Sequence, residues 1–276
     1  MRTKNATQLK ARINVRAKEA GILAQSMMQN YLFERLSRSS WRGNVVIKGG
    51  MLISSLVGVA SRTTMNFDTT VTGLVLTRES AERVFREVAA VSTDDDWSFE
   101  FNRTEDIRET DDYPGIRVYL RTVYPSMSAP LAIDVTTGDS TTPGPIGYDY
   151  PLLFDGGRVR LMSYSLGTVL AEKLETIVSR GVTNTRPRDF YDAHLLWRTK
   201  GDNYDVLTLR EALKATCTKR GSAERMERWR AVLDEVATDQ TMLALWGKYV
   251  KKNFYASDIE LAQCCETARQ ILGAAI

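Results

Sequence analysis

The sequence predicts an α+β protein in which helices come first, a mostly antiparallel or mixed sheet follows, and a helical domain comes last. Three observations support this order. Apolar residues recur at helical spacing in residues 6–39, β-branched and alternating segments fill residues 44–136, and helical spacing returns from about residue 165. At 276 residues the chain is long enough for two domains, which we expect to span residues 1–160 and 161–276.

The first segment is expected to form two basic helices that are separated at Gly21. Residues 1–42 contain nine Lys or Arg and two Glu, a local charge of +7 (9 − 2), whereas residues 94–112 contain two Arg and nine acids, a local charge of −7 (2 − 9). A basic helix can bind a phosphate backbone, but two solvated faces of opposite sign explain the pattern equally well. Charge alone therefore does not assign nucleic-acid binding.

Five segments are predicted to be strands, because they are rich in β-branched residues or alternate between apolar and polar residues. The loops between them contain Asp, Pro and Gly, which is typical of hairpins rather than of repeated βαβ units. One helix is predicted between the second and third strands. The strands are 44–48, 66–76, 97–103, 115–123 and 130–136, and the helix is 78–92.

Six helices are predicted in the last domain, where Gly, Asp or Ser positions separate the segments of helical spacing. Pro187 stands at a favourable first-turn position in the second of them. The predicted helices are 166–180, 187–199, 205–217, 224–236, 239–252 and 257–272.

Composition places the chain among ordinary globular proteins, with 43% hydrophobic and 26% charged residues. No apolar run reaches the length of a bilayer span and the first residues lack an apolar signal core, so we expect a cytoplasmic protein without a membrane segment. The three cysteines have no C-x-x-C spacing and are expected to be reduced thiols. Because His194 is the only histidine, catalysis must use carboxylates, lysine and arginine, and we expect His194 to pack or to cap a helix.

A glycine pair follows the first predicted strand and is the first candidate site. Lys48-Gly49-Gly50 stands between an apolar strand and an apolar segment that begins the next helix. Backbone amides left bare at such a strand-to-helix junction can bind phosphate oxygens. The simpler alternative is that the glycines only make a turn.

Three polar side chains in two predicted strands are candidate metal ligands. Asn66 and Asp68 flank Phe67, and because strand side chains alternate, they face one side while Phe67 faces the core. Asp134 lies in an otherwise apolar strand and needs a cation or hydrogen-bond donors there. If the two strands are neighbours, these oxygen ligands suit magnesium. The alternative for Asp134 is a solvent-facing position at the end of its strand.

The first two helices of the last domain carry further charged candidates. Lys173 lies on a mainly apolar helix face, so it either extends its ammonium to solvent or meets an anion such as a nucleotide phosphate. Asp189 and Asp192 lie one turn apart at the start of the next helix. They either compensate the helix dipole and pair with Arg186 or Arg188, or they belong to the site.

In this order and spacing, the motifs resemble those of the AbiEii/AbiGii (MenT-like) nucleotidyltransferase toxins over about residues 44–200. The resemblance implies a polymerase-β-like nucleotidyltransferase domain with a helical C-terminal domain. It also implies a toxin of an abortive-infection toxin–antitoxin pair used in phage defence, which has a cognate antitoxin, uses a nucleoside triphosphate and Mg²⁺, and modifies tRNA. The motifs are Lys48-Gly49-Gly50-Met51, Arg62 to Asp68, Ile133 to Asp139, Ala171 to Thr176 and Arg188 to Asp192.

The resemblance assigns roles to residues of the sheet domain. Gly49 and Gly50 would form the phosphate-binding turn, with Lys48 beside them in the nucleotide site. Asp68 would be the second acid of the family's Asp-x-Asp motif and Asp134 its third acid. Both acids would be catalytic metal ligands.

The resemblance also assigns roles to the helical domain, which would contribute to the same site. Lys173 would contact the triphosphate. Asp189 would support that lysine or the nucleotide, with Arg188 and Asp192 as their neighbouring partners.

Asn66 departs from the family pattern, which has Asp at this position. As a ligand, Asn offers a neutral oxygen and would bind magnesium with one negative charge fewer. Three explanations compete: an inactivating substitution made to protect an expression host, a natural variant with one carboxylate fewer, and a catalytically dead relative.

Three functions are compatible with these features. In the first, an RNA hydroxyl attacks the α-phosphorus of a nucleoside triphosphate, and basic residues in 1–42 and 214–230 hold the RNA. In the second, the acceptor is a protein or a small molecule. In the third, the chain binds a nucleotide or an antitoxin without catalysis. The cations in 214–230 are Lys214, Lys219, Arg220, Arg225, Arg228 and Arg230.

Overall fold

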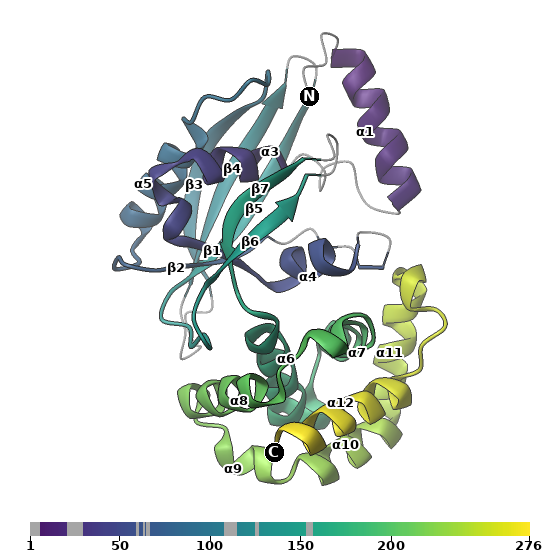
Figure 1. Ribbon diagram of the computed structural model, residues 1–276. Coiled ribbons are helices and arrows are strands. Elements are labelled where there is room, and N and C mark those ends of the chain that lie inside the picture. Colours follow the sequence, from purple (N-terminus) through teal and green to yellow (C-terminus); the bar gives the residue numbers. More distant parts are fainter. Residues whose placement is uncertain are drawn as a thin grey trace. The chain divides into compact units, whose positions relative to one another are not determined.

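The computed structural model of the chain divides into two compact units (Figure 1). The sheet unit comprises residues 1–139 and 146–163, and the helical unit comprises residues 140–145 and 164–276. The residues that the structure describes are 6–20, 30–58, 61–62, 64, 67–107, 115–124, 127–152 and 157–276.

The sheet unit is built on a seven-stranded sheet with the order β3-β4-β5-β2-β1-β7-β6. The pairs β1–β7 and β2–β5 are parallel and the other pairs are antiparallel, so the predicted α+β fold with a mixed sheet is confirmed. The strands are β1 (Val45–Lys48), β2 (Phe67–Val71), β3 (Ser98–Ile107), β4 (Gly115–Tyr124), β5 (Met127–Thr136), β6 (Ile146–Pro151) and β7 (Arg158–Ser163).

The centre of the sheet is apolar on the face against which Phe33 packs. Phe33 contacts Phe67 of β2 edge to face, with ring centroids 4.8 Å apart. Because side chains alternate along a strand, Asp68 faces the opposite side of the sheet from Phe67. The helices of this unit are α1 (Ala6–Ala20), α3 (Asn30–Arg38), α4 (Gly49–Val57) and α5 (Arg78–Ala89), with a short 3-10 helix η1 (Ser40–Gly43).

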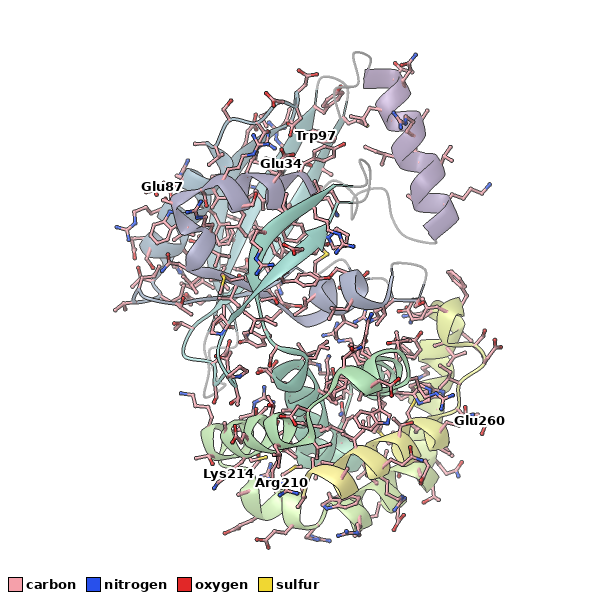
Figure 2. All side chains as sticks on the ribbon, viewed as in Figure 1. Glu34, Glu87, Trp97, Arg210, Lys214 and Glu260 are labelled. Carbon is pink, nitrogen blue, oxygen red and sulfur yellow. The ribbon has the colours of Figure 1, made fainter. Side chains whose placement is uncertain are left out.

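The basic and acidic segments of the sequence meet at one buried ion pair. Arg35 of α3 binds both carboxylate oxygens of Asp95, at 2.7 and 3.1 Å, and donates to the carbonyl of Trp97 (labelled in Figure 2). Burial would raise the pKa of Asp95, but the hydrogen bonds and the charge of Arg35 outweigh it and lower that pKa. Arg35 is therefore a core residue and is not one of the basic residues in 1–42 that are available to hold RNA.

The helical unit packs its helices around one apolar core, and three of the helices begin at a side-chain cap. Ser165 caps α6, Asp205 caps α8 and Asp239 caps α11 through side-chain oxygens that accept backbone N–H groups. The helices are α6 (Leu166–Arg180), α7 (Pro187–Lys200), α8 (Val206–Arg220), α9 (Ala223–Glu227), α10 (Trp229–Thr238), α11 (Gln240–Lys252) and α12 (Leu261–Ala275), with short 3-10 helices η2 (Gly181–Thr183), η3 (Gly201–Asn203) and η4 (Phe254–Ala256).

The largest differences from the sequence prediction lie in three regions. The β6–β7 hairpin was not predicted, because only Tyr150 of β6 is buried and the strand lies at the sheet edge. The predicted strand 66–76 ends at Val71, shortly before Gly73 with a φ of +77°. The predicted helix 224–236 is interrupted at Arg228 and becomes α9 and α10.

Membrane spans were predicted to be absent. Among the helices that the structure describes, none has the length and apolar character needed to cross a bilayer.

Candidate functional site

Four charged residues occupy facing positions on four neighbouring strands of the sheet unit. Lys48 of β1 faces Asp68 of β2, Asp68 faces Asp134 of β5, and Asp134 faces Arg117 of β4. Residues that face each other in a strand pair project on the same side of the sheet. We call these four residues the charge row, in which two acids lie between two cations.

Asp134 is buried and its carboxylate is held by Arg117. The Nε of Arg117 donates to Oδ1 at 2.6 Å and Nη2 donates to Oδ2 at 2.9 Å. This hydrogen bonding raises the pKa of Arg117 more than burial lowers it. Asp134 does not point to solvent. The cation that its buried carboxylate needs is Arg117, which the sequence analysis did not identify.

Asp68 is the open acid of the charge row. It is half-exposed, and within the described part of the chain its side chain has no hydrogen bond and no ion pair. Its in-register position beside Asp134 brings together two of the three predicted metal ligands. Asn66, the third, lies outside the described residues.

Gly49 and Gly50 begin α4, and Gly49 lies directly beside Asp68. Gly49 has a φ of +63°, and a Cβ atom there would overlap the carboxylate of Asp68. A Cβ atom at Gly50 would lie 2.8 Å from Oγ1 of Thr64. The first turn of α4 contains no acid, and no side chain caps it. These uncovered amides at a helix N-terminus are the features that favour a phosphate group.

Replacing Gly49 with alanine is expected to lower the free energy of unfolding by about 2 kcal/mol or more, because the positive φ and the overlap with Asp68 add. The matched control is Gly221→Ala, since Gly221 has a φ of +60° with open space around its position. Thermal unfolding and nucleotide binding of both variants check this expectation. Equal stability and unchanged nucleotide binding in the two variants would show that the close approach at Gly49 has no role.

Lys48 is less available for phosphate than the sequence suggested. Its Nζ donates to Oγ1 of Thr136 at 2.6 Å and forms an ion pair with Asp139. Both side chains of this pair are mostly buried. Lys48 therefore ties β1 to the end of β5, and its predicted contact with the nucleotide stays a prediction.

In the helical unit, Lys173 of α6 meets two acids of α7. Its Nζ lies 2.5 Å from Oδ1 of Asp189 and 3.0 Å from Oδ2 of Asp192. Burial alone would lower the pKa of Lys173, but Asp189 and Asp192 outweigh it and raise that pKa. Lys173 therefore does not extend to solvent, and its anionic partners are Asp189 and Asp192. The role of Asp189 in nucleotide transfer stays a prediction.

The arginine that joins this cluster is Arg186. Its Nε lies 3.3 Å from Oδ2 of Asp189. Arg188, predicted as a partner, is half-buried, and among the described residues its side chain has no ion pair. Pro187 lies at the start of α7 as predicted, and it brings Asp189 into the first turn of the helix.

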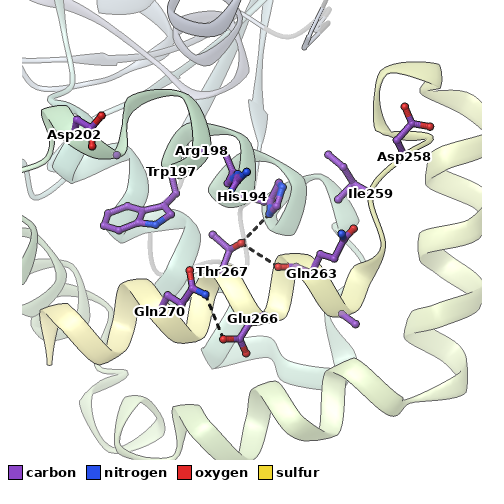
Figure 3. A pocket seen from close by; sticks show the side chains of 12 residues that line it. His194, Trp197, Arg198, Asp202, Asp258, Ile259, Gln263, Glu266, Thr267 and Gln270 are labelled. Atoms are coloured by element: carbon purple, nitrogen blue, oxygen red, sulfur yellow. Dashed lines mark hydrogen bonds between the residues drawn. The ribbon is translucent and has the colours of Figure 1, made fainter.

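His194 contributes to a different feature of the helical unit. Its Nδ1 lies 2.8 Å from Oγ1 of Thr267, which Figure 3 shows on the facing helix α12. Burial and the nearby Arg198 lower the pKa of His194. It lines an open pocket of about 750 Å³ that contains none of the predicted site residues, so His194 packs between helices rather than joining the charged clusters.

The basic residues proposed to hold RNA divide into two groups. Arg220 is committed to Glu172 and Glu175 of α6, so it is not a free phosphate ligand. Lys214, labelled in Figure 2, is exposed on α8. Four further cations of the segment are also exposed: Lys219, Arg225, Arg228 and Arg230.

One protein family matches the chain, and several solved structures are similar to it. A family model described as nucleotidyl transferase AbiEii toxin, type IV toxin–antitoxin system, matches residues 30–271. Among solved structures, JHP933 from Helicobacter pylori is 13% identical over 91% of each chain with a TM-score of 0.49. An antigenic nucleotidyltransferase-like protein from Paracoccidioides brasiliensis is 15% identical, over 75% of this chain and 92% of that chain, with a TM-score of 0.43. No curated protein sequence matches the chain.

The family model spans most of the chain, including every motif on which the resemblance rests. The expected family and its nucleotidyltransferase activity are therefore confirmed. The chain belongs to the AbiEii nucleotidyltransferase toxins of type IV toxin–antitoxin systems.

Proposed function

We propose that this toxin transfers a nucleoside monophosphate from a nucleoside triphosphate to RNA, with tRNA as the acceptor and Mg²⁺ as the cofactor. The observation that carries the proposal is the in-register pair of Asp68 and Asp134 beside the uncovered start of α4 at Gly49. Two carboxylates beside a phosphate-binding helix end are what a metal–triphosphate complex requires.

The donor set fits magnesium rather than a metal cage made only of protein. In the described residues, no group of three or more His, Cys, Asp or Glu side chains gathers to hold a metal. Magnesium is usually bound by one or two carboxylates, with substrate phosphates and water as the other ligands. Asp68 and Asp134 would supply two oxygen ligands of this kind. When bound, Mg²⁺ would neutralise phosphate charge and lower the pKa of the attacking hydroxyl.

The residues of the chain would align the reaction. The start of α4 would bind phosphate oxygens through its backbone N–H groups and hold the triphosphate against the charge row. The hydroxyl oxygen of the acceptor would form a bond to the α-phosphorus while the bond to the pyrophosphate oxygen breaks. The contact of Lys173 with the triphosphate, and with it the contribution of the helical domain to the site, stays a prediction from the family.

The RNA acceptor is supported by the family resemblance and by cations without acidic partners. Lys214, Arg225 and Arg228 are exposed, and among the described residues none of their side chains has an ion pair. Such residues would bind a phosphate backbone with an affinity that falls steeply as salt rises.

Asn66 favours a second candidate function, nucleotide binding without catalysis. A relative that only binds the nucleotide would lack one of the carboxylates that hold the metal. We expect that Asn66→Asp raises nucleotide transfer, since it adds one negative charge at a proposed metal ligand. Total tRNA is incubated with magnesium and each α-labelled nucleoside triphosphate, and the RNA is resolved on a denaturing gel. Growth after induced expression measures toxicity in parallel and is expected to worsen.

The matched control is Asn102→Asp, which adds the same charge at an exposed position of β3. Label on tRNA from the Asn66→Asp variant at a higher level than from the other two proteins supports the proposal. Label on protein or on a small molecule instead would move the acceptor to those classes. Absence of pyrophosphate release from both variants, with nucleotide still bound, would make the chain a binding-only relative.

A further inference from the structure

Arg117 occupies the oxygens through which Asp134 would bind a divalent cation. Its two nitrogens reach the two carboxylate oxygens at 2.6 and 2.9 Å, the bidentate geometry in which arginine and carboxylate interact most strongly. A neutral partner in this position would orient the acid and leave its charge available. A guanidinium instead neutralises the acid that the metal needs.

The charge row has no net charge as the structure shows it. Lys48 and Arg117 contribute two positive charges, and Asp68 and Asp134 contribute two negative charges. Metal affinity rises with the number of charged ligands that are free to bind. Removing the positive charge of Arg117 would leave the row at −1 and would free both oxygens of Asp134.

The two partners differ in how easily they can separate. The side chain of Arg117 is 35% exposed, whereas that of Asp134 is 10% exposed. Arg117 can therefore turn to water or to another anion, while Asp134 is fixed on a central strand. A triphosphate is such an anion, because arginine binds phosphate with the same bidentate geometry as carboxylate.

We propose that Arg117 is a positioning residue that competes with the divalent cation for Asp134, so that metal binds tightly only together with the nucleotide. This inference rests on the proposed function of the charge row. Without nucleotide, Arg117 holds Asp134 in place and keeps the affinity for bare metal low. When the metal–nucleotide complex enters, the phosphates give Arg117 a new partner and Asp134 becomes a ligand.

The test measures Mn²⁺ binding by electron paramagnetic resonance, with and without a non-hydrolysable nucleoside triphosphate. For the full chain we expect weak binding of bare Mn²⁺ and much tighter binding with nucleotide. Arg117→Met is expected to tighten the binding of bare Mn²⁺ by about 10-fold and to reduce the gain from nucleotide. Arg121→Met is the matched control, because Arg121 lies on the same strand in an exposed pair with Glu100, and it is expected to leave both affinities unchanged.

The outcomes distinguish two roles of Arg117: competition with the divalent cation for Asp134, and simple orientation of the Asp134 carboxylate. A folded Arg117→Met variant that binds bare Mn²⁺ equally well or more weakly overturns the inference, since an orienting partner strengthens metal binding. If Arg117→Met does not fold, Arg117→Lys replaces it as the test variant. Lysine keeps the positive charge but cannot make the two-point contact with Asp134. We expect Arg117→Lys to tighten the binding of bare Mn²⁺ by a smaller factor than Arg117→Met. Unchanged or weaker binding of bare Mn²⁺ by Arg117→Lys would also overturn the inference.

The Asp68→Asn and Asp134→Asn variants distinguish failure of this inference from failure of the proposed function. If Mn²⁺ binding with nucleotide depends on both acids but Arg117 has no effect, only the competition is wrong. If no variant binds Mn²⁺ even with nucleotide, the magnesium site of the proposed function is wrong and the inference is wrong with it.

Discussion

Replacing Lys173 with methionine is expected to lower the free energy of unfolding of the helical unit by about 3–5 kcal/mol. The ammonium of Lys173 lies between the carboxylates of Asp189 and Asp192, whose side chains are 2% and 0% exposed. Removing the cation would leave two buried carboxylates beside each other without the ammonium that lies between them. Like charges held close together in a buried site are among the most costly defects in a folded protein.

Two comparisons isolate the ion cluster from the loss of side-chain packing. In the triple variant Lys173→Met, Asp189→Asn, Asp192→Asn, most of the lost stability should return, because the two buried carboxylates that repel each other are replaced by neutral amides. In Arg160→Met, which breaks an exposed pair with Asp149, the loss should be no more than about 1 kcal/mol. Urea unfolding followed by circular dichroism measures all three. A loss in Lys173→Met as small as that in Arg160→Met would show that the cluster does not stabilise the fold.

The pH dependence of the unmodified chain has a defined sign. The pKa of Lys173 is raised in the folded state by Asp189 and Asp192. A raised lysine pKa contributes stability that is complete below the ordinary lysine value of about 10.5 and is lost as pH rises through the raised value. The contribution of the Lys173 ammonium to the stability of the unmodified chain should therefore be complete near neutral pH and should be lost in strongly alkaline solution.

The helical unit shows which parts of the fold were visible in the sequence. The helix from residue 166 to 180 was predicted with both ends correct, because Ser165 accepts the N–H of Thr168 and Gly181 follows the last turn with a φ of +49°. Capping signals of this kind are local and can be recognised without tertiary structure. The β6–β7 hairpin has no comparable signal, because β6 lies at the sheet edge and Tyr150 is its only buried residue.

The charged clusters show the same difference: features set by neighbouring residues in the sequence were predictable, and contacts between distant segments were not. Alternation along one strand placed Asp68 and Phe67 on opposite faces, and a charge in an apolar strand showed that Asp134 needs a partner. Arg117 could not be identified as that partner, because the register of β4 against β5 decides which residue faces Asp134. The choice of Arg186 rather than Arg188 for Asp189 is likewise set by side-chain direction at the start of α7, which spacing does not specify.

Replacing Asp68 with asparagine in the Asn66→Asp background is expected to lower the rate of nucleotide transfer by at least about 100-fold, which is about 2.7 kcal/mol of transition-state stabilisation. Asp68 is the acid of the charge row that no described side chain neutralises. Its charge is therefore available to a metal, and asparagine would remove that charge while keeping the size of the side chain. Single-turnover transfer to labelled tRNA, with nucleotide in excess, measures the effect.

The melting temperature of the Asp68→Asn variant distinguishes a role of Asp68 in metal binding from a role in stabilising the fold. Because Asp68 has no ion pair in the described residues, Asp68→Asn should unfold at nearly the same temperature as its parent, whereas Asp134→Asn should lose stability through its broken contact with Arg117. Asp149→Asn, at an exposed position of β6, controls for the loss of one carboxylate and should leave the rate unchanged. If Asp68→Asn retained the parental rate with a normal melting temperature, Asp68 would not be a metal ligand, and the chemistry would have to be assigned to other residues.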